Sequence, residues 1–205
     1  MEHETSNSVI VILAAGASSR METPKQLLRW GEDTLISHTI KTALKVKDSE
    51  VIVVLGAHYE LIEKEIKQYP ITILKNKNWQ LGLGKSIACS ADYILNSNSK
   101  VDSMLVTLAD QPLIDSKFLD RLINTFQKNK ACIVATLYEK GANGVPAIFD
   151  KKYFEELLIL NDDKGAKHLL KKYKSSVKTL IPELENVDLD IKADYEMLYK
   201  KKFSI

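Results

Sequence analysis

The sequence predicts an α/β fold: a three-layer, Rossmann-like domain built around a mostly parallel, mixed sheet. Short apolar runs rich in β-branched residues alternate with stretches of helical periodicity along most of the chain. The runs are continuously apolar rather than alternating with polar residues, which is typical of strands buried on both faces of a sheet. Alternating strands and helices of this kind favour right-handed β-α-β units.

Five strands are expected first, at residues 9–14, 51–56, 71–74, 103–109 and 132–137. Between them, apolar residues follow the spacing of one buried helix face in three stretches: Ile36, Ile40, Ala43 and Leu44; Ile87, Ala91, Ile94 and Leu95; Phe118, Leu122, Ile123 and Phe126. The later part is less regular, and there we expect a strand at 146–150, helices near 153–160 and 165–172, a strand at 177–181 and a terminal helix at 192–202.

Composition limits the class of protein. A chain of 205 residues that is 45% hydrophobic predicts a single domain, residues 1–205. Its formal net charge of +2 is too balanced for a protein held mainly by nucleic-acid phosphates. The polar first residues and the lack of a long apolar run predict a cytoplasmic protein without a membrane partner. Cys89 and Cys132 have no CxxC spacing, so buried thiols are expected rather than a metal site or a disulfide.

The first candidate site is the loop after the first strand, in "VILAAGASSRM". Ligands of open α/β sheets bind outside the carboxyl ends of the strands. The small residues 14–19 would let backbone N–H groups surround phosphates, with Arg20 and Lys25 closing on them as cations. The alternative is a tight turn followed by a surface arginine. The loop is neither GxGxxG nor GxxxxGK[ST], so a dinucleotide fold or a Walker site is not indicated.

Aspartates provide the second and third candidates. Asp110 follows an apolar strand in "LADQP", and we expect its side chain in solvent at the ligand edge of the sheet. Asp188 and Asp190 lie two apart in "DLDIKADY", which places both on one side of an extended segment. Carboxylates so placed could hold Mg²⁺, which prefers hard oxygen ligands. The alternatives are an aspartate that caps a turn and a loop that leads into the terminal helix.

The fourth candidate is "WQLGLGKSIACS", where glycines lead into a helix with Lys85 and Ser86 near its start. A helix N-terminus attracts anions, and glycines allow close contact with a base or sugar. Leu81 and Leu83 could narrow the space for the base and so favour a pyrimidine. The alternative is an ordinary capped turn.

Together these motifs resemble the nucleotidyltransferase superfamily, and most closely its molybdenum cofactor cytidylyltransferase family. The resemblance rests on LAAGASSRM followed by PKQLL, and on WQLGLGKSI, LADQP, GVPAIFD, DDKGAK and DLDIKADY. It extends from near residue 9 to near residue 195, almost the whole chain.

The resemblance implies a domain of the nucleotidyltransferase type, with an NTP on the first loop and Mg²⁺ between its phosphates and the aspartates. It implies catalytic roles for Arg20, Lys25 and Asp110, and metal ligation by Asp110 and Asp190. The implied nucleotide-binding residues are Leu13, Ala14, Ala15, Gly16, Arg20, Lys25, Gly82 and Ser86. The implied acceptor-binding residues are Gly144, Pro146 and Lys167.

The chain departs from the family pattern at three places. Glu22 replaces a glycine, Lys167 replaces an arginine that could clamp phosphate with two hydrogen bonds, and Ile191 and Lys192 replace Thr-Pro. These changes affect the acceptor more than the nucleotide chemistry, and they leave open whether activity is altered.

The expected function is therefore transfer of CMP from CTP to a phosphorylated acceptor, molybdopterin, with release of pyrophosphate. One alternative is cytidylyl or guanylyl transfer to another acceptor, such as a sugar or polyol phosphate. A second alternative is a non-catalytic maturation factor that binds the cofactor and a molybdenum hydroxylase apoprotein. The base, the acceptor and the oligomeric state are left open by the sequence.

Overall fold

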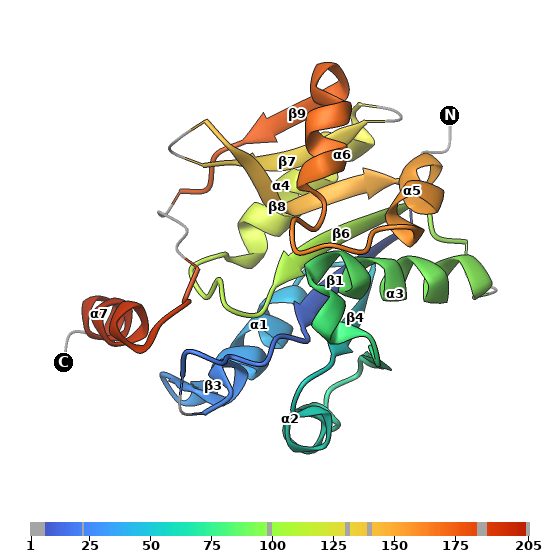
Figure 1. Cartoon of the computed structure of the whole chain (residues 1–205). Helices are drawn as coiled ribbons and strands as arrows, with labels where there is room; N and C mark the ends of the chain where they lie inside the picture. Colours follow the sequence, from blue (N-terminus) through green and yellow to red (C-terminus); the bar gives the residue numbers. More distant parts are fainter. Residues whose placement is uncertain are drawn as a thin grey trace.

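A computed structural model describes residues 7–21, 23–97, 100–129, 132–138, 141–183 and 188–203. Its centre is a seven-stranded sheet with helices on both faces (Figure 1). The predicted three-layer, mostly parallel α/β fold is confirmed. No helix in these ranges is both long enough and apolar enough to cross a bilayer.

The strand order places β1 near the middle of the sheet. Across the sheet the order is β5 (Thr72–Lys75), β4 (Ser49–Leu55), β1 (Ser8–Ala14), β6 (Ser103–Leu108), β8 (Asn143–Asp150), β7 (Ile133–Leu137) and β9 (Val177–Leu180). Every pair is parallel except those of β8, which runs antiparallel to both β6 and β7. Val11 of β1 pairs with Ile52 and Val106, so the carboxyl ends of β1 and β6 meet at one edge.

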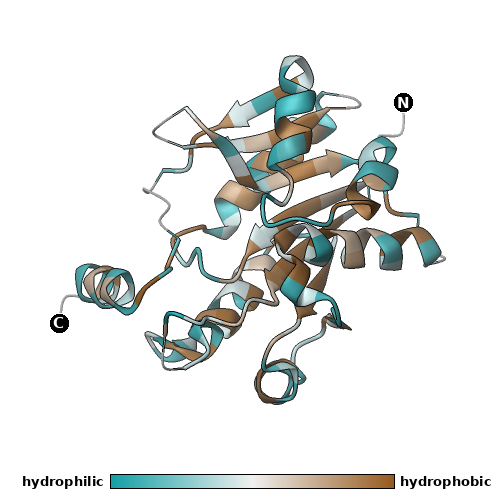
Figure 2. Cartoon of the chain, viewed as in Figure 1, coloured by the Kyte–Doolittle hydropathy of each residue, from teal (hydrophilic) through white to brown (hydrophobic). Residues whose placement is uncertain are grey.

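Two separate cores explain why the strands are continuously apolar. Helices α1 (Leu35–Ala43), α2 (Tyr59–Ile66) and α4 (Ser116–Gln127) pack on one face, and α3 (Leu83–Asn96), α5 (Phe154–Leu158) and α6 (Lys167–Lys172) on the other. Ile10 and Ile12 of β1 point into the first core, whereas Val9 and Val11 point into the second. Figure 2 shows the result, with hydrophobic strands at the centre and hydrophilic residues on the outer surfaces of the helices.

Side-chain caps begin two of these helices. Thr34 accepts a hydrogen bond from the backbone N–H of Ser37 at 3.2 Å, and Asp115 accepts one from that of Phe118 at 2.8 Å. These bonds satisfy N–H groups that a helix start leaves without partners. The predicted strands agree with the observed ones within about two residues, except that β8 begins three residues earlier than expected, at Asn143.

A hairpin and the C-terminal helix form a third, smaller cluster that the sequence did not predict as a unit. The hairpin joins β2 (Arg29–Trp30) to β3 (Asp33–Thr34), and α7 (Lys192–Phe203) lies beside it (Figure 1). Trp30, Leu35, Leu189 and Leu198 are buried together there. This packing brings the segment before α7 to the carboxyl end of β6.

Four short 3-10 helices complete the described structure: η1 (Lys25–Leu27), η2 (Trp79–Leu81), η3 (Lys151–Tyr153) and η4 (Lys174–Ser176). The first two lie beside the edge of the sheet where β1 and β6 end, because Lys25, Gln26, Trp79 and Gln80 line the same pocket as the ends of these strands. Both cysteines are free thiols; Cys132 is buried, as predicted, whereas Cys89 is only partly buried.

Candidate functional site

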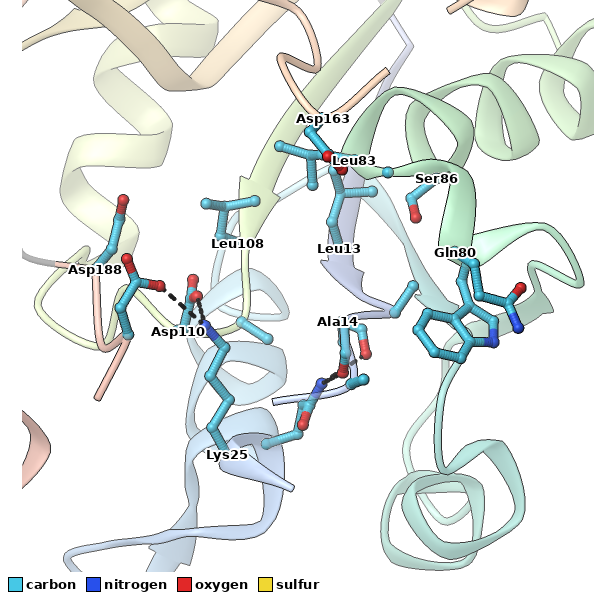
Figure 3. A pocket seen from close by; sticks show the side chains of 18 residues that line it. Leu13, Ala14, Lys25, Gln80, Leu83, Ser86, Leu108, Asp110, Asp163 and Asp188 are labelled. Carbon is cyan, nitrogen blue, oxygen red and sulfur yellow. Dashed lines mark hydrogen bonds and ion pairs between the residues drawn. The ribbon is translucent and has the colours of Figure 1, made fainter. Parts of the chain in front are cut away.

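A pocket of about 390 Å³ opens at the carboxyl ends of β1 and β6 (Figure 3). Its walls come from the loop after β1, from η1 and η2, from the start of α3 and from the segment before α7. The lining residues are Leu13, Ala14, Ala15, Gly16, Ala17, Lys25, Gln26, Trp79, Gln80, Gly82, Leu83, Ser86, Leu108, Ala109, Asp110, Asp163, Asp188 and Asp190. Most of the residues predicted to bind nucleotide or metal therefore face one pocket.

The loop after β1 is held in shape by Gln26. Its side-chain amide donates to the carbonyl oxygens of Ala14 and Gly16, both at 2.9 Å, and the side chain is almost fully buried. Ser18 supports the same turn, because its hydroxyl accepts a hydrogen bond from the backbone N–H of Lys25 at 3.0 Å. Sequence reasoning gave Gln26 no role. Its position in the PKQLL motif, between Lys25 and two leucines, could have suggested that it has a role.

Lys25 lies between two aspartates that the sequence singled out, Asp110 (Figure 3) and Asp190. Its ammonium group forms an ion pair with Oδ2 of Asp110 and lies 3.6 Å from Oδ1 of Asp190. It also donates to the carbonyl oxygen of Leu189 at 3.2 Å. The ammonium group thus lies among three oxygen atoms, an environment that suits a cation.

The expectation that Asp110 lies in solvent is wrong. Its side chain is only 15% exposed, because the segment before α7 covers the end of β6. The backbone N–H of Leu189 donates to the carbonyl oxygen of Asp110 at 3.1 Å, and the side chain of Leu189 is fully buried. Burial raises the pKa of the Asp110 carboxyl above its usual value, and the nearby ammonium of Lys25 opposes this shift without cancelling it.

The oxygen atoms around Asp110 suit a divalent cation whose remaining ligands come from a bound substrate and water. Oδ1 of Asp110 is buried and has no hydrogen-bond partner among the described residues, so it is available to coordinate. Within those residues, no three His, Cys, Asp or Glu side chains are arranged as a complete metal site. Asp110 and Asp190 could hold Mg²⁺ with substrate phosphates and water as its other ligands, which is the usual coordination of that ion.

The opposite end of the pocket is shaped by glycine at the start of α3. Gly82 has a φ of +97°, and a Cβ there would lie 2.3 Å from Oδ1 of Asp163. Ser86, one turn later, is buried and accepts a hydrogen bond from the side-chain amide of Asn76 at 3.1 Å. The carboxylate of Asp163 therefore packs directly over the glycine turn, on the wall of the pocket.

Three lining residues at this end were missed by sequence reasoning: Trp79, Gln80 and Asp163. Trp79 packs against Gly56, where an added Cβ would lie 2.5 Å from that of Trp79. Trp79 belongs to the motif WQLGLGKSI and Asp163 to DDKGAK, so the motifs behind the family resemblance could have identified both residues. Leu83 lines the pocket as expected, but Leu81 is 55% exposed and is not part of the lining, because η2 turns it outward.

Several residues predicted for the site do not line this pocket. Arg20 is exposed, and so is Lys167, the first residue of α6. Gly144 and Pro146 lie in the first half of β8, where Pro146 is buried. Ile191 and Lys192 are exposed where α7 begins. Glu22 lies outside the described residues, and the roles of the others stay predictions.

Fold and site together define an α/β protein with a pocket of about 390 Å³ at the carboxyl edge of its sheet. The chain belongs to the MobA-like NTP transferase domain family, which it matches over residues 10–177.

A curated relative is the bifunctional protein GlmU of Francisella philomiragia subsp. philomiragia. It is 33% identical over 128 residues, which are 62% of this chain and 27% of that protein. The GlmU of Francisella tularensis subsp. novicida is 29% identical over 146 residues, 70% of this chain and 30% of that protein. The chain thus spans less than a third of the length of these relatives.

Solved structures share the fold over nearly the whole chain. The homologue of Rv0371c from Mycobacterium sp. strain JC1 is 26% identical with a TM-score of 0.82, covering 97% of this chain and 98% of that one. Rv0371c of Mycobacterium tuberculosis H37Rv, in complex with manganese, is 24% identical with a TM-score of 0.79, covering 95% and 99%. A CMP:2-keto-3-deoxy-manno-octonic acid synthetase with CTP is 16% identical with a TM-score of 0.75, covering 97% and 99%.

Proposed function

We propose that this NTP transferase domain transfers CMP from CTP to a phosphorylated small-molecule acceptor, molybdopterin, and releases pyrophosphate. The observation that carries the proposal is the meeting of Lys25, Asp110 and Asp190 at one end of a pocket that is also lined by residues 13–17, at the end of β1 and in the loop after it. This end offers a cation to phosphates and carboxylates to a metal ion, and the rest of the pocket offers backbone groups and apolar side chains to a nucleoside.

In this reaction an oxygen of the acceptor's phosphate attacks the α-phosphorus of CTP, and the bond from that phosphorus to the bridging oxygen breaks. The electron pair leaves with pyrophosphate. Lys25 would neutralise the charge that develops on the leaving group, so it would bind the transition state better than the substrate. No covalent enzyme intermediate is required, and catalysis consists of positioning and charge neutralisation.

Asp110 and Asp190 would hold the divalent cation, with Oδ1 of Asp110 as the free coordinating atom. Neutralisation of the triphosphate is the chemistry that a bound Mg²⁺ supplies. Because the Lys25 ammonium lies between the same two carboxylates, it must turn toward the phosphates when a cation enters. The manganese complex of Rv0371c supports a divalent ion in this fold, without identifying Mg²⁺.

Cytidine is proposed as the nucleoside because large apolar side chains line the end of the pocket away from Asp110. Leu83 and Trp79 lie on its walls, and the base would meet the backbone of residues 13–16 and the turn at Gly82. A pyrimidine amine could donate to backbone carbonyls there without a dedicated side chain. The synthetase complexed with CTP supports this choice only at the level of the shared fold.

The acceptor is proposed to enter beside Gly144 and Pro146, with Lys167 available to its phosphate. Lys167 is exposed at the start of α6, so this assignment rests on the family resemblance. A molybdenum hydroxylase apoprotein would then be the recipient of the product.

The deciding experiment measures pyrophosphate release with each of the four NTPs, with and without molybdopterin. We expect release with CTP, Mg²⁺ and molybdopterin together. Release with GTP alone among the nucleotides would replace cytidine by guanosine, and release that needs a sugar or polyol phosphate would replace the acceptor. Binding of CTP without turnover under every condition would favour the non-catalytic maturation factor.

A further inference from the structure

Gln111 is a buried polar side chain to which the proposed reaction gives no part. It follows Asp110 at the end of β6, and only 3% of its surface is exposed. Burying an amide away from water is unfavourable unless its hydrogen bonds are made inside the protein. The partners of Gln111 therefore indicate why it is there.

The amide nitrogen of Gln111 connects two other parts of the chain. Nε2 donates to Oδ1 of Asp188 at 2.7 Å and to the hydroxyl oxygen of Tyr138 at 2.9 Å. The Tyr138 hydroxyl in turn donates to the carbonyl oxygen of Val145. Nε2 also lies 3.4 Å from the carbonyl oxygen of Val145, so three acceptors surround the amide nitrogen, whereas the buried Oε1 has no hydrogen-bond partner among the described residues. The acceptors around Nε2 determine which way the amide faces.

This hydrogen-bond chain fastens the segment before α7 to the end of β6. The backbone N–H of Leu189 also donates to the carbonyl oxygen of Asp110, at 3.1 Å. The segment 188–190 is thus held at two successive residues, once through its backbone and once through the Asp188 carboxylate. The second of these bonds has a charged acceptor, which makes it the stronger type.

Both lining carboxylates of that segment depend on this attachment. Asp188 receives the bond from Gln111 directly, whereas the side chain of Asp190 is 60% exposed and has Lys25 as its ion-pair partner among the described residues. This hydrogen bond joins residues 77 positions apart, and it fastens the residue two positions before Asp190 to the residue after Asp110.

We propose that Gln111 is a positioning residue: by binding Asp188 it holds the 188–190 segment so that Asp190 faces Asp110 across the cation site. The proposal deepens the proposed nucleotidyl transfer and rests on it for the identity of the site. It requires no contact between Gln111 and the nucleotide or the acceptor, and Gln111 is not among the residues that line the pocket.

The test uses the whole chain. Electron paramagnetic resonance measures its affinity for Mn²⁺, and steady-state kinetics measure its kcat and its KM for CTP. Gln111→Asn keeps the amide but is one methylene shorter, so it cannot reach Asp188. We expect its Mn²⁺ affinity to fall about fivefold and its kcat about tenfold, while the KM for CTP changes less than threefold, because the nucleotide is held mainly by the loop after β1. Gln127→Met, on the exposed end of α4, is the control and should match the wild type.

Rescue distinguishes positioning from a general loss of packing. Asp188→Glu lengthens the partner by the methylene that Gln111→Asn removes, so the double variant should recover Mn²⁺ affinity to within twofold of the wild type. Thermal melts of every variant show which ones fold, and Gln111→Met replaces Gln111→Asn if the latter does not fold.

Three results would overturn the proposal: wild-type Mn²⁺ affinity in Gln111→Asn, no recovery in the double variant, or no Mn²⁺ binding by the wild type. The proposed function fails separately. If the wild type releases no pyrophosphate from any NTP but its Mn²⁺ affinity follows the pattern above, then Gln111 positions a cation site in a protein with another activity.

Discussion

At the scale of single residues, Lys25 connects the proposed phosphate site to the proposed cation site. Its ammonium lies among Asp110, Asp190 and the carbonyl oxygen of Leu189, so one positive charge now occupies the region assigned to a divalent cation. A nucleotide that brings its own cation would release Lys25 to the phosphates. Lys25 would thus have an anionic partner both with and without bound nucleotide.

Lys25→Ala should lower kcat by about 100-fold or more, the size of effect seen when one group that stabilises transition-state charge is removed. The reason is that charge moves to the leaving pyrophosphate as the bond breaks. Steady-state kinetics with varied CTP measure it. Arg20→Ala, at an exposed position outside the pocket lining, is the comparison and should have the smaller effect on kcat. A rise in KM alone for Lys25→Ala would reduce its role to ground-state binding.

Asp110→Asn should abolish turnover and Mn²⁺ binding with little change in the melting temperature. The isosteric amide leaves no cavity, and Lys25 keeps Asp190 and the Leu189 carbonyl as partners. Loss of a metal ligand removes several kcal/mol, roughly, of transition-state stabilisation. Pyrophosphate release and a thermal melt of the same preparation provide the measurement. Normal turnover in a folded Asp110→Asn protein would disprove the metal assignment.

At the scale of elements, Gly82 at the start of α3 and Gly16 in the loop after β1 both line the pocket, but they differ in the space around them. A Cβ on Gly82 would lie 2.3 Å from Asp163 and 2.7 Å from the backbone of Asp162, and its φ is +97°. Gly16 has nothing within 4 Å of the corresponding position. Substitution by alanine should therefore affect the stability of the protein at Gly82 but not at Gly16.

Gly82→Ala should destabilise the protein by about 1–3 kcal/mol, because both the backbone conformation and the space are unfavourable. Gly16→Ala should leave the free energy of unfolding nearly unchanged and weaken CTP binding instead. Urea unfolding measures the first effect, and titration with CTP measures the second. Equal stability of the two variants would show that the 161–165 loop can move away from α3.

The contact between α7 and the hairpin gives a second prediction at the scale of elements. Leu198 is buried with Trp30, Leu35 and Leu189, whereas its neighbour Met197 is 64% exposed. Leu198→Ala should cost about 2 kcal/mol of stability, the lower end for a buried leucine because this cluster is small. Met197→Ala is the matched control and should be neutral. Because Leu189 shares the cluster, Leu198→Ala should also weaken Mn²⁺ binding.

At the scale of the whole molecule, the pocket couples ligand binding to folding. Residues from the loop after β1, from α3, from the end of β6 and from the segment before α7 line it together, and the unfolded chain has no such site. A ligand that binds only the folded state raises its stability by about 2.7 kcal/mol at a hundred times Kd.

Thermal melts with Mg²⁺ and each of the four NTPs should therefore rank the nucleotides, with CTP giving the largest rise in melting temperature. Leu83 and Trp79 line the proposed base site and should leave less room for a purine than for a pyrimidine, which is the reason for this order. Asp110→Asn is the control, since it should reduce the rise in melting temperature with all four nucleotides. A larger shift with GTP, accompanied by GTP-dependent pyrophosphate release, would replace the cytidylyl assignment but retain nucleotidyl transfer.

The sequence by itself determined the layers and most element boundaries. Burial on both faces makes β1, β4 and β6 continuously apolar, and helices such as α4 carry their core face as a local pattern, so both signals can be read from near neighbours. The antiparallel β8 was visible as a strand, but its direction was not, because strand direction depends on pairing with β6 and β7. The hairpin at β2 and β3 was missed, since two-residue strands carry almost no pattern.

Only the tertiary structure decided how the site is assembled. Lys25 and Asp110 are 85 residues apart and Lys25 and Leu189 are 164 apart, so no local spacing could place that ammonium between two carboxylates. The same holds for the burial of Asp110, which depends on α7 docking on the hairpin, and for the bond from Gln111 to Asp188. Motifs identify which groups the chain can offer, whereas packing between distant segments determines which of those groups meet and how much water remains around them.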